Sequence, residues 1–102
     1  MELVNIFLPL EDNEGTPFPR EAFARVRDEL TERFGGVTIF MRAPADGFWK
    51  EGEKKTTADS LAIFEVVLES LDEAWWAGYR AELEQRFRQK RVLIHATTMR
   101  LV

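Results

Sequence analysis

The sequence predicts a single α+β domain whose segments follow the order strand, helix, strand, strand, helix, strand. The hydrophobic pattern changes repeatedly between a period of two, typical of strands, and a period of about 3.6, typical of helices. A chain of 102 residues has the usual length of one domain, so we expect residues 1–102 to share one core. Hydrophobic residues make up 45% of the chain and include eight Phe and three Trp, which is enough apolar material for that core.

The first strand and the first helix are predicted in the N-terminal third. Leu3 to Leu8 is rich in aliphatic and aromatic residues and stops at Pro9, which cannot donate a hydrogen bond to a neighbouring strand. A helix is expected to begin at Pro17 or Pro19 and to end at the Gly35-Gly36 pair. Its apolar residues recur at helical spacing: Phe23, Val26, Leu30 and Phe34.

Two further strands are predicted in the middle of the chain. Val37 to Ala43 alternates between two chemically different faces, as a strand does. Pro44 to Lys55, with turn residues at Asp46-Gly47, predicts a long hairpin connection. Ser60 to Leu68 is almost continuously apolar and is interrupted only by Glu65, which is typical of a central strand covered on both faces.

The second helix and the last strand complete the predicted domain. Ser70-Leu71-Asp72-Glu73 matches a capping box, so we expect the helix to start at Ser70. The last strand is predicted over Arg91 to Leu101. The apolar stripe of the helix is Trp76, Tyr79, Leu83 and Phe87.

Short connections and right-handed crossovers then favour an antiparallel sheet ordered last, first, third, second, with both helices on one face. This is a ferredoxin-like split βαβ arrangement. A helical bundle is the poorer alternative, because most segments have strand periodicity.

Composition excludes several classes of site. The chain has no Cys, which excludes disulfides, thiolate zinc sites and cysteine nucleophiles, and its single His makes a metal site unfavourable. The net charge of −4 disfavours nucleic acid, and the N-terminus resembles no signal peptide. We expect a cytoplasmic protein without a membrane span, metal or cofactor.

Strand alternation divides the predicted sheet into two faces. The face expected under the helices holds Val4/Ile6/Leu8, Val37/Ile39/Met41, Ala62/Phe64/Val66/Leu68 and Val92/Ile94/Ala96. The opposite face, called the open face below, holds Leu3/Asn5/Phe7, Thr38/Phe40/Arg42, Leu61/Ile63/Glu65/Val67 and Leu93/His95/Thr97/Met99. Monomers rarely leave so apolar a face in water, so we expect a homodimer through it, burying about 800 Å² per partner.

Asn5, Glu65 and His95 are the candidate catalytic residues, because all three are predicted on the open face of adjacent strands. A carboxylate beside the only imidazole is the minimum for general acid–base chemistry. Arg42 is a further group that could pair with Glu65. The structural alternative is a polar network that sets strand register or joins two subunits.

Further candidates for ligand contact are Arg42, Phe40, Trp49 and Thr97. Trp49 follows the predicted Asp46-Gly47 turn and has no place in the core periodicity, which suggests either ligand contact or anchoring of the hairpin. Trp76 is in phase with the core, and Trp75 is expected to cover a sheet edge.

Motifs of known families with this fold are mostly missing. The third strand lacks the basic, glycine and aromatic signature of RNA-binding sheets. Gly35-Gly36 follows a helix rather than preceding one, so it cannot direct helix amides at a phosphate. The segment after the first strand also lacks the glycine-rich loop and Arg of acylphosphatases.

A weaker resemblance rests on short motifs that run from Glu21 to the end of the chain. They are Phe34-Gly35-Gly36-Val37-Thr38, then Gly47, Trp49 and Gly52, then Asp59 before Ile63-Phe64-Glu65-Val66, and Phe87 ahead of Val92-Leu93-Ile94. In these motifs the chain resembles a family of small bacterial proteins that is described as a domain of unknown function. That resemblance implies a ferredoxin-like fold and no activity. At the level of fold the chain is also similar to dimeric α+β barrel proteins, which include cofactor-free monooxygenases and small-ligand binders.

Two functional hypotheses follow. The first is a dimeric domain that binds a small ligand or a protein partner at its open face. The second is a cofactor-independent enzyme, similar to a monooxygenase or isomerase, that uses Glu65 and His95 with Asn5 or Arg42 as orienting groups.

Overall fold

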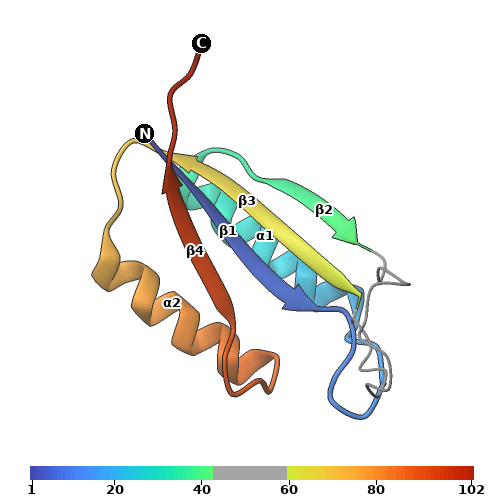
Figure 1. The fold of residues 1–102 in the computed structure, drawn as a ribbon. Helices are drawn as coiled ribbons and strands as arrows, with labels where there is room; N and C mark the ends of the chain where they lie inside the picture. The colour runs from blue at the N-terminus through green and yellow to red at the C-terminus, as the bar shows by residue number, and fades with distance from the viewer. Residues whose placement is uncertain (43–59) are drawn as a thin grey trace, which may run out of the picture.

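The computed structural model describes residues 1–42 and 60–102 and contains the six predicted elements in the predicted order (Figure 1). The predicted hairpin over 44–55, which includes Trp49, lies outside the described residues. The elements are β1 (Glu2–Pro9), α1 (Arg20–Phe34), β2 (Thr38–Arg42), β3 (Leu61–Leu68), α2 (Glu73–Arg86) and β4 (Leu93–Thr98).

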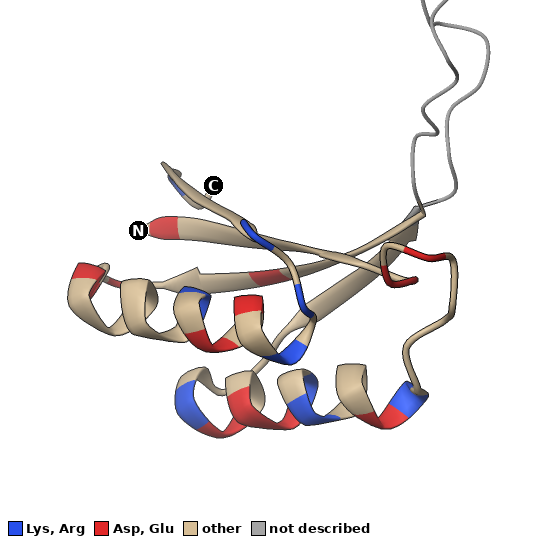
Figure 2. Ribbon diagram, turned by 90° about the horizontal axis from the view of Figure 1, so that it is seen from below, with Lys and Arg blue, Asp and Glu red and all other residues tan. Residues whose placement is uncertain are grey.

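The strands form one sheet in the order β2-β3-β1-β4, and every neighbouring pair is antiparallel. Both helices lie on the same side of this sheet, and most of the charged residues of the regular elements are on the helices rather than the strands (Figure 2). The predicted ferredoxin-like α+β fold, its strand order and its helical layer are therefore confirmed.

The core lies between the sheet and the helices. In β1 and β3 the predicted helix-facing residues are all buried, as are Val26 and Leu30 of α1 and Trp76, Tyr79 and Leu83 of α2. Each fully buried Leu, Ile, Val or Phe stabilises the fold by roughly 1.5–3 kcal/mol relative to an exposed side chain. The central strands thus carry the core, as their nearly continuous apolar sequence indicates.

At the sheet edges two residues of the predicted helix-facing set are on the predicted side but are not covered, since Met41 lines a hollow with residues of α1 and Ala96 one with residues of α2. Met41 of β2 is 63% exposed and Ala96 of β4 is also exposed, although both belong to the helix-facing set. They are on the outer strands, where the two helices do not cover the ends of the sheet. Ile39 and Ile94, nearer the middle of the same strands, do pack against the core.

The C-terminal end of α1 and the N-terminal end of α2 are capped in different ways. Gly35 closes α1 in the left-handed region, with φ of 89°, and donates its backbone N–H to the Thr31 carbonyl at 2.7 Å, which confirms the predicted glycine stop. The predicted start of α2 is wrong. Asp72, not Ser70, is the N-cap, because α2 begins at Glu73 and the Asp72 carboxylate accepts from the Trp75 backbone N–H at 3.1 Å.

Candidate functional site

The open face holds a row of polar side chains at the middle of the sheet. Asn5 of β1 is paired across the sheet with Glu65 of β3 on one side and with His95 of β4 on the other. Thr38 of β2 extends the row, because it pairs with Glu65. The strand register therefore brings together the three candidate catalytic residues that the sequence suggested.

Apolar side chains surround this polar row. Phe40, Val67 and Leu93 are 47%, 45% and 55% exposed, although each is a large hydrophobic residue. Phe7 stacks on the His95 ring, with centroids 5.4 Å apart and planes 28° apart. The open face thus combines apolar surface, one aromatic stack and a central strip of hydrogen-bonding groups.

The remaining predicted ligand contacts are distributed around the row. Phe40 pairs with Ile63 on the β2 side, and Thr97 pairs with Leu3 on the β4 side. The structure describes only the backbone of Arg42, at the end of β2, so its predicted contact with Glu65 stays a prediction.

Within one chain, the row does not assemble an acid–base pair. No hydrogen bond or ion pair links the side chains of Asn5, Glu65 and His95, all of which the structure describes. Neighbouring strands lie about 4.8 Å apart, so Glu65 and His95 stand roughly 10 Å apart with β1 between them. A proton relay needs heavy atoms about 2.6–3.2 Å apart, so one chain alone does not provide it.

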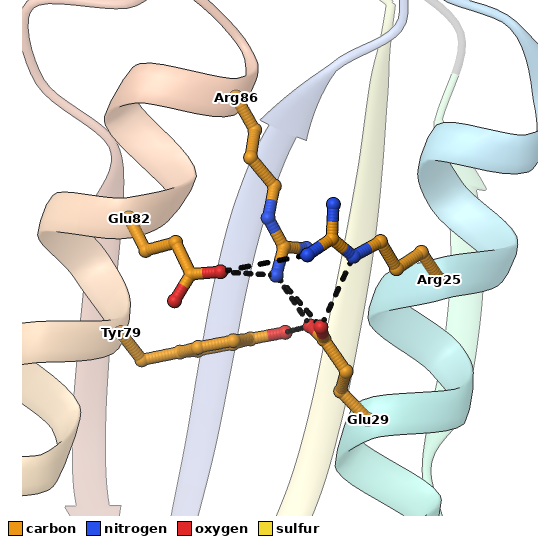
Figure 3. A network of polar contacts seen from close by, with 5 residues as sticks. All are labelled: Arg25, Glu29, Tyr79, Glu82 and Arg86. Atoms are coloured by element: carbon orange, nitrogen blue, oxygen red, sulfur yellow. Dashed lines mark hydrogen bonds and ion pairs between the residues drawn. The ribbon is translucent and has the colours of Figure 1, made fainter.

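A second polar cluster joins the two helices, and no pattern in the sequence predicts it (Figure 3). The Glu29 carboxylate on α1 accepts from Tyr79 Oη at 2.8 Å and from Arg86 Nη2 at 2.7 and 2.9 Å. Arg25 Nε donates to the same carboxylate at 3.2 Å, and Arg86 also pairs with Glu82. This interhelical network connects residues 50 and 57 positions apart, so no local spacing could have revealed it.

The network shifts the acid–base properties of its members. Partial burial raises the pKa of Glu29, but hydrogen bonds from Arg86 and Tyr79 and the nearby Arg charges outweigh it and lower the pKa below its ordinary 4.5. Burial and the Glu29 carboxylate together raise the pKa of the Tyr79 hydroxyl, so it stays protonated and donates. Glu29 therefore stays ionised and accepts hydrogen bonds, while Tyr79 stays protonated and donates one.

An open groove of about 720 Å³ runs beside this network between α1 and α2. Trp75 forms one wall, stacked on Tyr79 at 4.9 Å and capped by the Arg33 guanidinium at 4.3 Å. Trp75 is thus between the helices rather than at the sheet edge where we predicted it. Trp76 is buried, as predicted. Because these aromatic faces and the Glu29 carboxylate already have partners within the chain, the groove is better explained as packing of α1 against α2.

Over residues 1–42 and 60–102, no three acidic or histidine side chains converge in a way that could ligate a metal ion. In the same ranges neither helix has the length and hydropathy of a membrane span.

Comparison with known proteins gives one informative likeness. No protein-family model matches the chain, and no curated protein does. Among solved structures, the chain is similar to a phage SAM lyase in complex with S-methyl-5′-thioadenosine. The two share 18% sequence identity with a TM-score of 0.59, over 94% of this chain and 79% of the lyase chain. At this identity the likeness supports the fold and does not transfer the activity.

Proposed function

We propose that this chain is a homodimeric small-molecule-binding domain whose ligand site lies on the open face, at the row formed by Asn5, Glu65 and His95. The observation that carries the proposal is the register, which gathers these polar groups in the centre of an otherwise apolar, exposed surface. Binding sites commonly combine apolar walls with a few converging polar groups.

The dimer is part of this proposal, because a sheet face alone has no walls to enclose a ligand. A second subunit on the open face would supply the missing wall and cover Val67 and Leu93, whose exposure is costly in water. An interface of standard size needs about 800 Å² per partner, which one face of a four-stranded sheet can supply.

The ligand class that fits best is a molecule with a flat ring and hydrogen-bonding substituents. The Phe7–His95 stack offers a planar surface, and the Glu65 carboxylate and Asn5 amide offer acceptors and a donor next to it. The phage SAM lyase supports this choice, since that protein has the same fold and holds S-methyl-5′-thioadenosine, which has a purine ring and a ribose.

The alternative is a cofactor-independent enzyme that uses the same row. The presence of a carboxylate and the only imidazole on one face favours it, as does the name of the structural neighbour, which is a lyase. Turnover of the bound ligand would separate this alternative from simple binding.

Light scattering and an NMR titration test the proposal. We expect a dimeric mass at micromolar concentration and, with S-methyl-5′-thioadenosine as the probe, shifts of amide signals in β1, β3 and β4. Glu65→Ala and His95→Ala should abolish the shifts while keeping the circular dichroism of the fold. The control Glu69→Ala, just beyond the end of β3, should not change them. A monomeric mass, or shifts confined to the interhelical groove, would contradict the proposal.

A further inference from the structure

The row on the open face is self-complementary. The inference drawn from this symmetry rests on the proposed dimer and specifies which residues of the two copies meet. We propose that Glu65 of one copy contacts His95 of a second copy across a two-fold axis that runs along β1 and passes over Asn5. Each dimer then contains two equivalent composite sites, and neither site exists in a single chain. The occupant of the open face is thus a second copy of this chain.

The symmetry of the row carries the argument. Asn5 is at its centre, with the acidic residue one strand away on β3 and the imidazole one strand away on β4. A rotation by 180° about an axis along β1 exchanges the two sides of the row. It therefore places Glu65 opposite His95 of the second copy, and Asn5 opposite its own counterpart.

The apolar residues match under the same rotation. Phe7 pairs within the sheet with Ile63 on one side and Leu93 on the other, so the rotation places Ile63 opposite Leu93 of the second copy. Leu3 and Phe7 each meet their own counterparts. Val67 and Thr97 both pair with Leu3, so the rotation places these two opposite each other, and β2 lies outside the overlap because β4 is the other edge of the sheet. The polar row thus faces the polar row, with apolar residues opposite each other at the level of Phe7.

Other axes in the plane of the sheet place the charges less favourably. An axis along the row brings Glu65 against Glu65 of the second copy, which buries two like charges. An axis between β1 and β3 places Glu65 opposite Asn5 and His95 opposite Thr38, because of the register of β2 and β3. That arrangement buries the carboxylate without a cationic group, which costs several kcal/mol.

The dimensions suit the pairing along β1. Sheets that pack face to face lie about 10 Å apart. A Glu and a His side chain standing on opposite sheets can together span that gap. By contrast, within one chain they stand side by side on the same surface, with Asn5 between them.

A charge-exchange experiment tests this pairing. Glu65→Lys places a lysine opposite His95, and His95→Glu places two carboxylates opposite each other, so each variant alone should dimerise at least tenfold more weakly than the wild type. In an equimolar mixture the introduced lysine meets the introduced glutamate, and Glu65 of one chain meets His95 of the other. We expect native mass spectrometry to show a heterodimer at least tenfold tighter than either variant's homodimer.

A matched mixture identifies the axis. Thr38→Lys mixed with His95→Glu restores a charge pair only for the axis between β1 and β3, so a preferred heterodimer in this mixture would overturn the inference. A wild-type dimer whose Glu65→Lys and His95→Glu mixture gains nothing would overturn the pairing and leave the proposed dimer standing. A monomeric wild type would remove both.

Folding of the variants is checked by circular dichroism. Both positions are on the open face and neither belongs to the buried core, so the spectrum should stay native. If Glu65→Lys does not fold, a double-mutant cycle with Glu65→Gln and His95→Gln on the dimerisation constant replaces it. Coupling of about tenfold supports the pairing, and additive effects contradict it.

Discussion

The molecule has two polar clusters with opposite properties. In the interhelical network of Arg25, Glu29, Tyr79, Glu82 and Arg86, the Glu29 carboxylate and Arg86 Nη2 have several partners inside one chain, whereas Arg86 Nε and Nη1 are buried without a hydrogen bond to the described residues. The open-face row of Asn5, Glu65 and His95 has no hydrogen bond among its members, all of which lie in the described part of the chain. Polar groups that already have partners stabilise a fold, whereas polar groups presented together on an apolar surface are available to something else.

From this comparison we expect the interhelical network to stabilise the fold and the open-face row to serve dimerisation and ligand binding. The network links α1 to α2 beside the open groove on the outer surface of the helical layer. The strands need no such side-chain link, since backbone pairing and the buried core already fix them.

The largest expected effect is at Glu29. Glu29→Ala removes the acceptor shared by Tyr79 and Arg86, and Arg86 is only 14% exposed, so its charge would keep Glu82 alone as a close partner. We expect a loss of about 2 kcal/mol in the free energy of unfolding. Urea denaturation measures it, with Asp28→Ala, one residue earlier on α1, as the control. A change below about 0.5 kcal/mol would mean that the network does not clamp the helices.

A smaller effect is expected from pH. The pKa of Glu29 is lower in the folded chain than its ordinary value of 4.5, so the ionised carboxylate stabilises the fold above that pH. The stabilisation is lost as the pH falls through the lowered folded pKa. Urea denaturation of the wild type and Glu29→Gln should therefore give a difference in stability that shrinks below about pH 4.5. A difference that stays constant from pH 7 to pH 3 would contradict this assignment.

The smallest effect on the folded protomer is expected at the row. Glu65→Gln should change the free energy of unfolding by less than about 0.5 kcal/mol, because no partner within the row loses a hydrogen bond. Denaturation at a concentration low enough to give monomers isolates this effect from dimerisation. A loss comparable to that of Glu29→Ala would show that the row is structural and would break the distinction between the two clusters.

The fold and the composition of each face of the sheet could be predicted from the sequence. Hydrophobic periods of two and about 3.6 located all six elements, since side-chain direction follows directly from backbone geometry. The same alternation placed Asn5, Glu65 and His95 on one face, and chain order placed β1 between β3 and β4. The glycine stop after α1 was also predictable, because Gly35 adopts a backbone conformation that other residues rarely do.

Local patterns were less reliable where two residues could serve the same purpose. Ser70 and Asp72 are both good caps, and the sequence motif selected the wrong one, because it is the Asp72 carboxylate that accepts from the Trp75 backbone N–H. Met41 belongs to the apolar set of its strand, yet the extent of α1 leaves it exposed.

Contacts between side chains that are far apart in the chain could not be predicted, because they depend on how the elements pack. Glu29 and Arg86 come together because α1 and α2 pack on the same side of the sheet, and the Phe7–His95 stack depends on the pairing of β1 with β4. The register that aligns Glu65, Asn5 and His95 in one row has the same origin. Periodicity gives each side chain a face, but the position along that face is set by the packing of the whole domain.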